Sequence, residues 1–436
     1  LRDEAPWCGA LEWELFAHYV LFPRVNDEDL SFHRALFHAA LWPRVEGLSS
    51  AEDRVLEVNR WCCEHASYQA QDERTASPLT VYRCGSGRCG EESAFLVSAL
   101  RSVGIAARQV YAPRWAHCGD NHAWVEALCG GTWRFLGACE PEPVLDRGWF
   151  NTAASRAVLV HSRLFGDGSS PLHGAPLGRD GGVGWYNQTP RYAQTRPVAL
   201  QALAGGKPAA GTRFEVQLLN DGFFHTVAVL TAGEDGRAGI ELGRGTIHVL
   251  ARLDGLMAEG DCDGDLLALE LRPLPAGDTG WEDFDAAAPA PDPARAVPLS
   301  PAQKRRRAEE LARCAALREA RPAEWYDPRR AAALPGREDL LRKARGNFGQ
   351  IASFLSRDGD PRREALARTL SDKDLRDVPA ATLEDHLQNL PPPPPGVPEE
   401  VYWRCLACPR AALEPLTPWR GTLRELLPPM GDDPAA

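Results

Sequence analysis

Cys89 is the residue whose type and setting in this chain are best suited to nucleophilic chemistry. It follows a short turn that contains Gly85 and Gly87, and it precedes the apolar, helix-like segment 94–103. At the start of a helix, backbone N–H groups without intrahelical partners favour a thiolate over a thiol. The same groups can hold the oxyanion that forms when a thiolate attacks a carbonyl carbon. The sequence therefore predicts a nucleophilic cysteine at position 89.

His122 is the predicted proton carrier for this cysteine. It begins a stretch in which apolar and larger side chains alternate as in a half-buried strand. A thiol nucleophile that cleaves an amide needs a group to protonate the leaving amine, and an imidazole held on a rigid sheet suits that role. His117 lies nearby and is the competing candidate, in a segment with the composition of a loop.

These residues lie within a longer pattern that resembles a known family. Its positions are Arg88-Cys89-Gly90-Glu91, Arg101, Gly104-Ile105, Arg108, Val110, His122, Trp124, Glu126, Trp133 and Ala138-Cys139-Glu140. In its order and spacing, the pattern is similar to the transglutaminase-like superfamily of papain-type thiol enzymes, and most of all to the peptide:N-glycanase core. The resemblance implies a nucleophile at Cys89 and a base at His122.

The resemblance also implies a third catalytic residue, and here the chain departs from the pattern. The family usually has an aspartate four residues after the strand tryptophan, and that position is Gly137 in this chain. We expect Glu140, three residues further on, to orient the histidine in its place. Asp146 and Asp120 are weaker alternatives. An orienting carboxylate is worth roughly 10⁴ in rate in other triads, so its absence does not by itself exclude catalysis.

Three residues are predicted to contact the substrate. Trp115 and Trp149 lie in segments with loop composition, where an aromatic ring can form a pocket wall. Glu91 follows the nucleophile by two residues. Trp124 and Trp133 lie in strand-like segments and are expected in the core of the sheet.

The length of 436 residues exceeds what one hydrophobic core supports, so the sequence predicts several domains. The expected fold class is multidomain α+β, with a transglutaminase-like (papain-type) core, a small β-sandwich and a C-terminal helical domain. The strand-rich segment resembles the carboxypeptidase-regulatory or transthyretin-like modules of bacterial proteins. The expected boundaries are an N-terminal helical extension (1–50), the core (51–165), a linker (166–191), the sandwich (192–275), a linker (276–300) and the helical region (301–436).

Composition restricts the classes of partner. The formal net charge of -11 argues against a nucleic-acid partner, and no run of apolar residues is long enough for a membrane span. Cys405 and Cys408 form the chain's single CxxC pair, so no metal site and no cofactor are expected. The chain begins at Leu1 and looks trimmed. The β-module weakly favours a secreted or cell-envelope protein, whereas the many unpaired thiols favour the opposite.

The preferred function is cysteine-dependent hydrolysis of an amide bond in a peptide or glycopeptide. Hydrolysis is preferred because most bacterial relatives implied by the resemblance are hydrolases. A protein-glutamine acyltransferase is the first alternative, since the two reactions differ only in whether water or an amine attacks the acyl intermediate. A non-catalytic binding or scaffold protein is the second alternative, and Gly137 is the feature that supports it.

Overall fold

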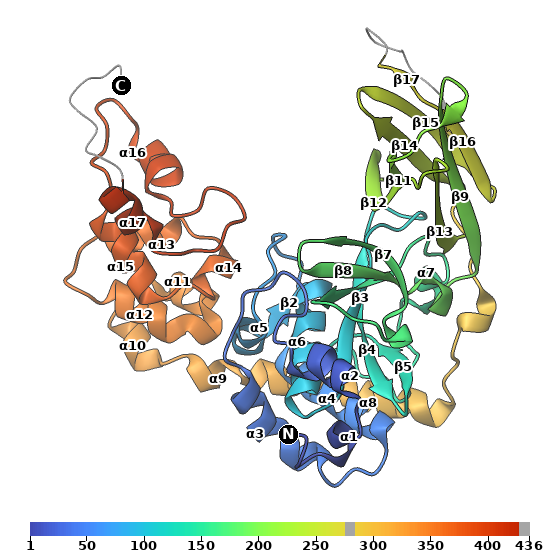
Figure 1. Cartoon of the computed structure of the whole chain (residues 1–436). Helices are drawn as coiled ribbons and strands as arrows, with labels where there is room; N and C mark the ends of the chain where they lie inside the picture. The colour runs from blue at the N-terminus through green and yellow to red at the C-terminus, as the bar shows by residue number, and fades with distance from the viewer. Residues whose placement is uncertain (275–283, 427–436) are drawn as a thin grey trace. The chain divides into compact units, whose positions relative to one another are not determined.

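The computed structural model describes residues 1–274 and 284–426, which fall into two compact units (Figure 1). The first unit comprises Leu1–Cys63 and Ser93–Glu310, and the second comprises Glu64–Glu92 and Leu311–Ala436. Helices account for 38% and strands for 23% of the structure, which confirms the predicted mixture of helices, several sheets and C-terminal helices.

An antiparallel six-stranded sheet forms the centre of the first unit, with the strand order β5-β4-β3-β6-β8-β7 (Figure 1). Strands β4 and β5 form a hairpin whose two turn residues, Gly130 and Gly131, have φ of 56° and 80°. A two-residue turn with both φ positive matches the twist of a hairpin and strongly favours glycine. The strands are β3 (Ala107–Ala112), β4 (His122–Cys129), β5 (Thr132–Leu136), β6 (His161–Phe165), β7 (Ala175–Asp180) and β8 (Val183–Asn187).

Helices α3 (Arg34–Val45), α4 (Ala51–His65) and α6 (Cys89–Ser102) supply much of the apolar core. The rings of Phe37, Trp61 and Phe95, one from each helix, lie with their centroids 5.4–5.5 Å apart. Such tilted and edge-on contacts between aromatic rings contribute beyond the burial of area alone. Ahead of them, the N-terminal segment contains the short helices α1 (Pro6–Gly9) and α2 (Trp13–Phe16).

A buried ion pair links β3 to β4. The Arg108 and Glu126 side chains are 2% and 0% exposed and lie 2.7 Å apart. Glu126 also accepts hydrogen bonds from Arg191 and from the Tyr192 hydroxyl. Burial raises the pKa of the Glu126 carboxyl, but the positive charge of Arg108, followed by Arg191 and the Tyr192 hydrogen bond, keeps it below its ordinary value. The Arg108 guanidinium lies 4.2 Å from the Trp133 ring centroid. Three positions of the family-like pattern therefore stabilise the sheet.

Two further sheets of the first unit share one hydrophobic core. One has the order β10-β9-β13, with β16 pairing in parallel to β9, and the other has the order β12-β11-β14-β15-β17. Leu200, Phe214 and Val249 are completely buried in this core. The strands are β9 (Thr195–Ala204), β10 (Lys207–Pro208), β11 (Arg213–Asn220), β12 (Phe223–Thr231), β13 (Arg237–Gly243), β14 (Ile247–Leu253), β15 (Leu256–Cys262), β16 (Leu266–Glu270) and β17 (Arg272–Pro273).

The segment 166–191, which its composition predicts as a linker, contributes strands to the central sheet. Within it, β8 pairs with β6 and β7 pairs with β8, both antiparallel. The pairing between β7 and β8 shifts register between Pro176 and Gly178. Glycine and proline are therefore accommodated at an irregular edge strand, where they interrupt the alternation that would otherwise indicate a strand. The linker expected at 276–300 lies partly outside the described residues, and its part 284–300 contains the 3-10 turn η4 (Pro293–Arg295).

The second unit combines a short internal segment with the C-terminal helices. The internal segment contains the parallel pair β1 (Ser67–Tyr68) and β2 (Ser86–Gly87) and helix α5 (Pro78–Cys84). Phe348, Ile351 and Leu366 are among the fully buried residues of its core. The later helices are α8 (Pro301–Ala320), α9 (Pro322–Trp325), α10 (Pro328–Ala332), α11 (Glu338–Lys343), α12 (Phe348–Leu355), α13 (Arg362–Arg368), α14 (Asp372–Leu375), α15 (Ala380–Gln388), α16 (Glu399–Val401) and α17 (Trp419–Leu426).

The compact units divide the predicted core segment 51–165. Residues 64–92, which include Cys89, belong with the C-terminal helices, whereas residues 93–165 belong with the central sheet. Sequence patterns place boundaries where composition changes, but residues 64–92 are held by contacts with residues far away in the chain. No helix among residues 1–274 and 284–426 is long and apolar enough to cross a membrane.

Candidate active site

The turn before Cys89 depends on two glycines. Gly85 caps α5 in the left-handed region with φ of 71°, where a side chain would strain the backbone. Gly87 belongs to β2, and a Cβ atom at this position would lie 2.9 Å from the Glu91 Cβ atom. Cys89 is then the first residue of α6, as the sequence predicts, and is partly exposed.

Glu91 fixes the start of α6. One of its carboxylate oxygens accepts a hydrogen bond from the Arg88 N–H at 2.7 Å. The other accepts one from the Ala76 N–H at 2.8 Å and lies 2.6 Å from the Lys373 ammonium group. The Glu91 side chain is only 1% exposed. Because its carboxylate already has these three partners, the arrangement supports a positioning role for Glu91 in preference to the predicted contact with substrate.

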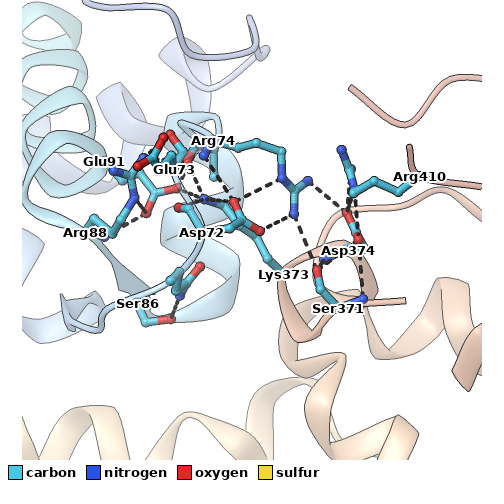
Figure 2. A network of polar contacts seen from close by, with 12 residues as sticks. Asp72, Glu73, Arg74, Ser86, Arg88, Glu91, Ser371, Lys373, Asp374 and Arg410 are labelled. Carbon is cyan, nitrogen blue, oxygen red and sulfur yellow. Dashed lines mark hydrogen bonds and ion pairs between the residues drawn. The ribbon is translucent and has the colours of Figure 1, made fainter. Parts of the chain in front are cut away.

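Lys373 and Glu91 belong to a network of charged side chains, which Figure 2 shows together with the neighbouring backbone contacts. Lys373 also lies 3.2 Å from Asp72. Arg74 bridges Asp72 and Asp374, at 2.6 and 2.8 Å. Asp374 is at the same time the N3 residue of a capping box at the start of α14, in which Ser371 is the N-cap. The network joins the segment before Cys89 to the C-terminal helices.

Two arginines hold the same turn from its other end. Arg345 donates hydrogen bonds to the Cys84 carbonyl at 2.8 Å and to the Ser86 hydroxyl at 2.9 Å. The Arg376 carbonyl accepts a hydrogen bond from the Cys84 thiol at 3.3 Å. Burial raises the pKa of the Cys84 thiol to about 12, so Cys84 stays a protonated, unreactive thiol at neutral pH.

His122, in the first unit, begins β4 and is 8% exposed. Burial lowers the pKa of its imidazole to about 4, and the nearby Asp120 opposes this only partly. The ring is therefore neutral at pH 7 and able to accept a proton. Among the residues that the structure describes, its Nε2 atom has no hydrogen-bond partner.

Aromatic rings surround His122. The centroids of Trp149 and Phe150 lie 4.8 and 4.9 Å from the imidazole centroid. Trp149 is 60% exposed, so its position is compatible with a pocket wall. Trp115 is 2% exposed and stacks on Trp124 with an interplanar angle of 7°, so its packing indicates a core residue.

The carboxyl group of Glu140 occupies the space next to Gly137. A Cβ atom on Gly137 would lie 2.3 Å from the Glu140 Oε2 atom, so the glycine makes room for this carboxyl. Oε1 accepts a hydrogen bond from Trp149 Nε1 at 3.0 Å. Burial raises the pKa of the Glu140 carboxyl to about 7, and the hydrogen bond from Trp149 opposes the rise. Within the described chain no hydrogen bond joins Glu140 to His122, and both residues contact Trp149.

The other candidate residues near His122 have different partners. Asp146 forms an ion pair with Arg134 and accepts a hydrogen bond from the Phe135 N–H. Asp120 is exposed and accepts a hydrogen bond from the Asn121 N–H. His117 lies in the loop between β3 and β4, and burial lowers the pKa of its imidazole.

Sequence reasoning missed Asn59, which holds the turn that carries Glu140. Its amide donates hydrogen bonds to the Gly137 carbonyl at 2.9 Å and to the Glu140 carbonyl at 3.2 Å. Its side-chain oxygen accepts one from the Cys139 N–H at 2.9 Å. Asn59 is completely buried. The sequence feature that could have identified it is a polar amide next to Val58, on the apolar face of α4. Among the described residues, no group of three or more histidine, cysteine or acidic side chains is placed to hold a metal ion.

Comparison with known proteins gives a family match for the segment that carries Cys89 and His122. Residues 40–138 match the model of the transglutaminase-like superfamily. One similar structure is a proposed cysteine protease from Cytophaga hutchinsonii, which is 16% identical over 41% of this chain and 65% of its own, with a TM-score of 0.25. Another is red sea bream transglutaminase, 12% identical over 63% of this chain and 66% of its own, with a TM-score of 0.26.

The chain thus spans slightly under two thirds of each of these two proteins. No curated protein matches it. Through residues 40–138, the chain carries a domain of the transglutaminase-like superfamily.

Proposed function

We propose that this protein is a cysteine hydrolase that cleaves amide bonds in a peptide or glycopeptide, with Cys89 as nucleophile and His122 as base. The observation that carries the proposal is His122 itself: a neutral imidazole on a rigid strand, with an Nε2 atom that has no hydrogen-bond partner among the described residues. Such an imidazole is ready to accept the thiol proton. The position of Cys89 at the start of α6 supports the choice of nucleophile.

The proposed reaction has two steps. The Cys89 sulfur attacks the amide carbonyl carbon while His122 accepts the thiol proton, and the imidazolium then donates this proton to the leaving amine as the C–N bond breaks. In the second step water attacks the thioester, His122 takes a proton from the water, and the carboxylic acid and the free thiol are released. An amine that replaced water would make the protein an acyltransferase.

Glu140 completes this proposal as the group that orients His122 through Trp149. Its carboxyl fills the space beside Gly137, the position at which the family pattern has aspartate. The hydrogen bond from Trp149 Nε1 to Glu140 and the contact between the Trp149 and His122 rings form a continuous path from the carboxyl to the imidazole. Glu91 fixes the first turn of α6, as its contacts with Arg88 and Lys373 support.

Alkylation of the native protein by iodoacetamide, mapped by peptide mass spectrometry, tests the nucleophile. Cys118 is exposed, and partial loss of solvation together with the negative charge of Asp120 raises the pKa of its thiol, so it is a useful internal comparison. We expect Cys89 to be alkylated faster than Cys118 at pH 7, and a Cys89→Ala variant to lose amidase activity on a peptide library. Labelling of Cys118 without labelling of Cys89 would favour the non-catalytic alternative. Incorporation of an added primary amine into the acyl product would identify a transferase.

A further inference from the structure

A strongly basic pocket lies in the unit that contains the C-terminal helices. It has a volume of about 670 Å³ and is formed by α5, the end of α8, the α9 and α10 region, α11 and the 3-10 turn η5 (Arg345–Asn347). The whole chain carries more acidic than basic residues, 60 against 49, so this concentration of positive charge is unusual for it. The charged residues that line it are five arginines (Arg83, Arg318, Arg321, Arg342, Arg345) and one glutamate (Glu319).

Arg321 is a buried cation in the pocket wall. Its guanidinium donates hydrogen bonds to the carbonyl oxygens of His65 at 2.6 Å and Tyr82 at 2.7 Å. Among the described residues, its nearest ion-pair partner is Glu324 at 3.5 Å, whose side chain is 64% exposed. A partner so exposed to water neutralises a buried charge only weakly.

Arg345 is the more unusual cation. Its hydrogen bonds to the Cys84 carbonyl, the Ser86 hydroxyl and the Gln69 amide oxygen all involve neutral acceptors. Within the described residues no carboxylate lies within ion-pair distance of it. Burial, and secondarily repulsion from Arg376, lowers the pKa of its guanidinium below the ordinary value. Proteins usually pair charges that are withdrawn from water, so a partly buried arginine whose described hydrogen-bond acceptors are all neutral calls for an anion when it lies beside a pocket.

The backbone conformation of Arg345 is a second observation that favours a ligand site here. Its φ is +48°, in the left-handed region that costs free energy for residues other than glycine. Such conformations persist where the surrounding structure over-determines them, and they cluster at ligand sites. Here the conformation places a partly buried cation on the pocket wall.

Arg83 and Arg342 supply exposed cations at the same pocket. In the described part of the chain, neither side chain forms a hydrogen bond or an ion pair with the protein. The Arg342 guanidinium lies 5.2 Å from the Tyr326 ring centroid, and this cation–π contact limits its motion. Two guanidinium groups of this kind can each bind an oxyanion in a bidentate manner.

We propose that this pocket binds an oxyanionic group, a phosphate or a carboxylate, of a small-molecule ligand. The volume lies in the range of about 300–1,000 Å³ that is typical of small-molecule sites. Trp325 and Tyr326 provide aromatic wall for the uncharged part of such a ligand. The proposal does not rest on the proposed amide hydrolysis, although Arg345 also holds the turn before Cys89.

Thermal unfolding of the full chain with increasing sodium phosphate or sodium acetate, at ionic strength held constant with sodium chloride, tests the proposal. A bound anion raises the melting temperature in a saturable manner, whereas general salt exclusion acts on every variant alike. The double variant Arg83→Gln/Arg342→Gln removes the two cations that form no described hydrogen bond or ion pair, so the fold should be retained. Arg424→Gln, on an exposed position of α17, is the matched control.

We expect at least one of the two anions to give a saturable shift in the wild type and in the control, with at least tenfold weaker binding in the double variant. The anion that does so identifies the class of ligand. Equal shifts in all three proteins, or no saturable shift with either anion, would overturn the proposal.

Discussion

Replacing Glu140 by glutamine is expected to stabilise the fold at neutral and alkaline pH and, at the same time, to lower activity. Burial raises the pKa of the Glu140 carboxyl from 4.5 to about 7. Glutamine has nearly the same shape and no charge, and its carbonyl can still accept the hydrogen bond from Trp149 Nε1. The variant therefore keeps the packing and removes only the carboxylate.

The sign and size of the stability effect follow from the shift in pKa. Because the folded state holds this proton more tightly than the unfolded state, the stability that Glu140 contributes is complete below pH 4.5 and is lost as the pH rises through about 7. The full difference corresponds to about 3 kcal/mol. Since glutamine does not titrate, the gain in stability of the variant over the wild type is expected to grow from about 1 kcal/mol at pH 5 to about 3 kcal/mol at pH 8.

Urea unfolding of both proteins at pH 5 and pH 8, followed by circular dichroism, measures this difference. Glu309→Gln, at an exposed position of α8, is the control and should leave the stability nearly unchanged at both values. The rate of Cys89 alkylation and the turnover of a peptide substrate measure the second effect.

Two results would refute the reasoning separately. A stability gain that is equal at pH 5 and pH 8 would mean that the Glu140 carboxyl is not held protonated by burial. A pH-dependent gain with unchanged turnover would mean that burial is described correctly but that Glu140 has no part in orienting His122.

Two further predictions concern the groups around the proposed reaction. Lys373→Met should destabilise the protein by about 3 kcal/mol, because it leaves the Glu91 carboxylate buried without a counter-charge, and it should slow the alkylation of Cys89. Urea unfolding measures the first effect and peptide mapping the second. Arg404→Gln, which breaks an exposed ion pair, is the control and should change the stability little. In the wild type, turnover is expected to fall as the pH drops through about 4, where the His122 imidazole gains a proton. The variant His122→Gln should lose this acid limb of the pH–turnover profile. If the limb persists in the residual turnover of the variant, another group produces it.

Local patterns in the sequence predicted much of the fold. Within the strand-rich segment expected at 192–275, alternating apolar residues between 198 and 271 mark six strands, β9, β11, β12, β13, β14 and β16. Strand β15 was missed because Gly260 and two acidic residues, Glu259 and Asp261, obscure its alternation. It was nevertheless signalled by Asp254-Gly255, a turn pair with φ of 45° and 81° between paired strands.

The places of the candidate site residues in the fold were predictable where their determinants are local. The glycine turn, the helix start at Cys89 and the strand start at His122 are all visible within a few residues. Spacing suggested that Glu140 takes over the orienting role that the family pattern gives to an aspartate at position 137. The space that Gly137 leaves for the Glu140 carboxyl supports this hypothesis. The burial of Trp115 was not predictable, because its stacking partner Trp124 lies across a loop.

The contacts that fix the turn before Cys89 could not be predicted from local patterns, for a physical reason. Hydrophobic periodicity reports which face of an element is buried, but a buried charge can be satisfied by any opposite charge that the fold brings near it. Arg74 and Lys373 belong to the same network although they are 299 positions apart. Lys373 lies in a helix of only four residues, and its sequence context predicts a solvent-exposed side chain. In the structure this side chain is only 6% exposed. Its partner Glu91 also accepts a hydrogen bond from the N–H of Arg88, the residue that precedes Cys89. The C-terminal helices therefore help to position the proposed nucleophile, and removing their charges should change the reactivity of Cys89.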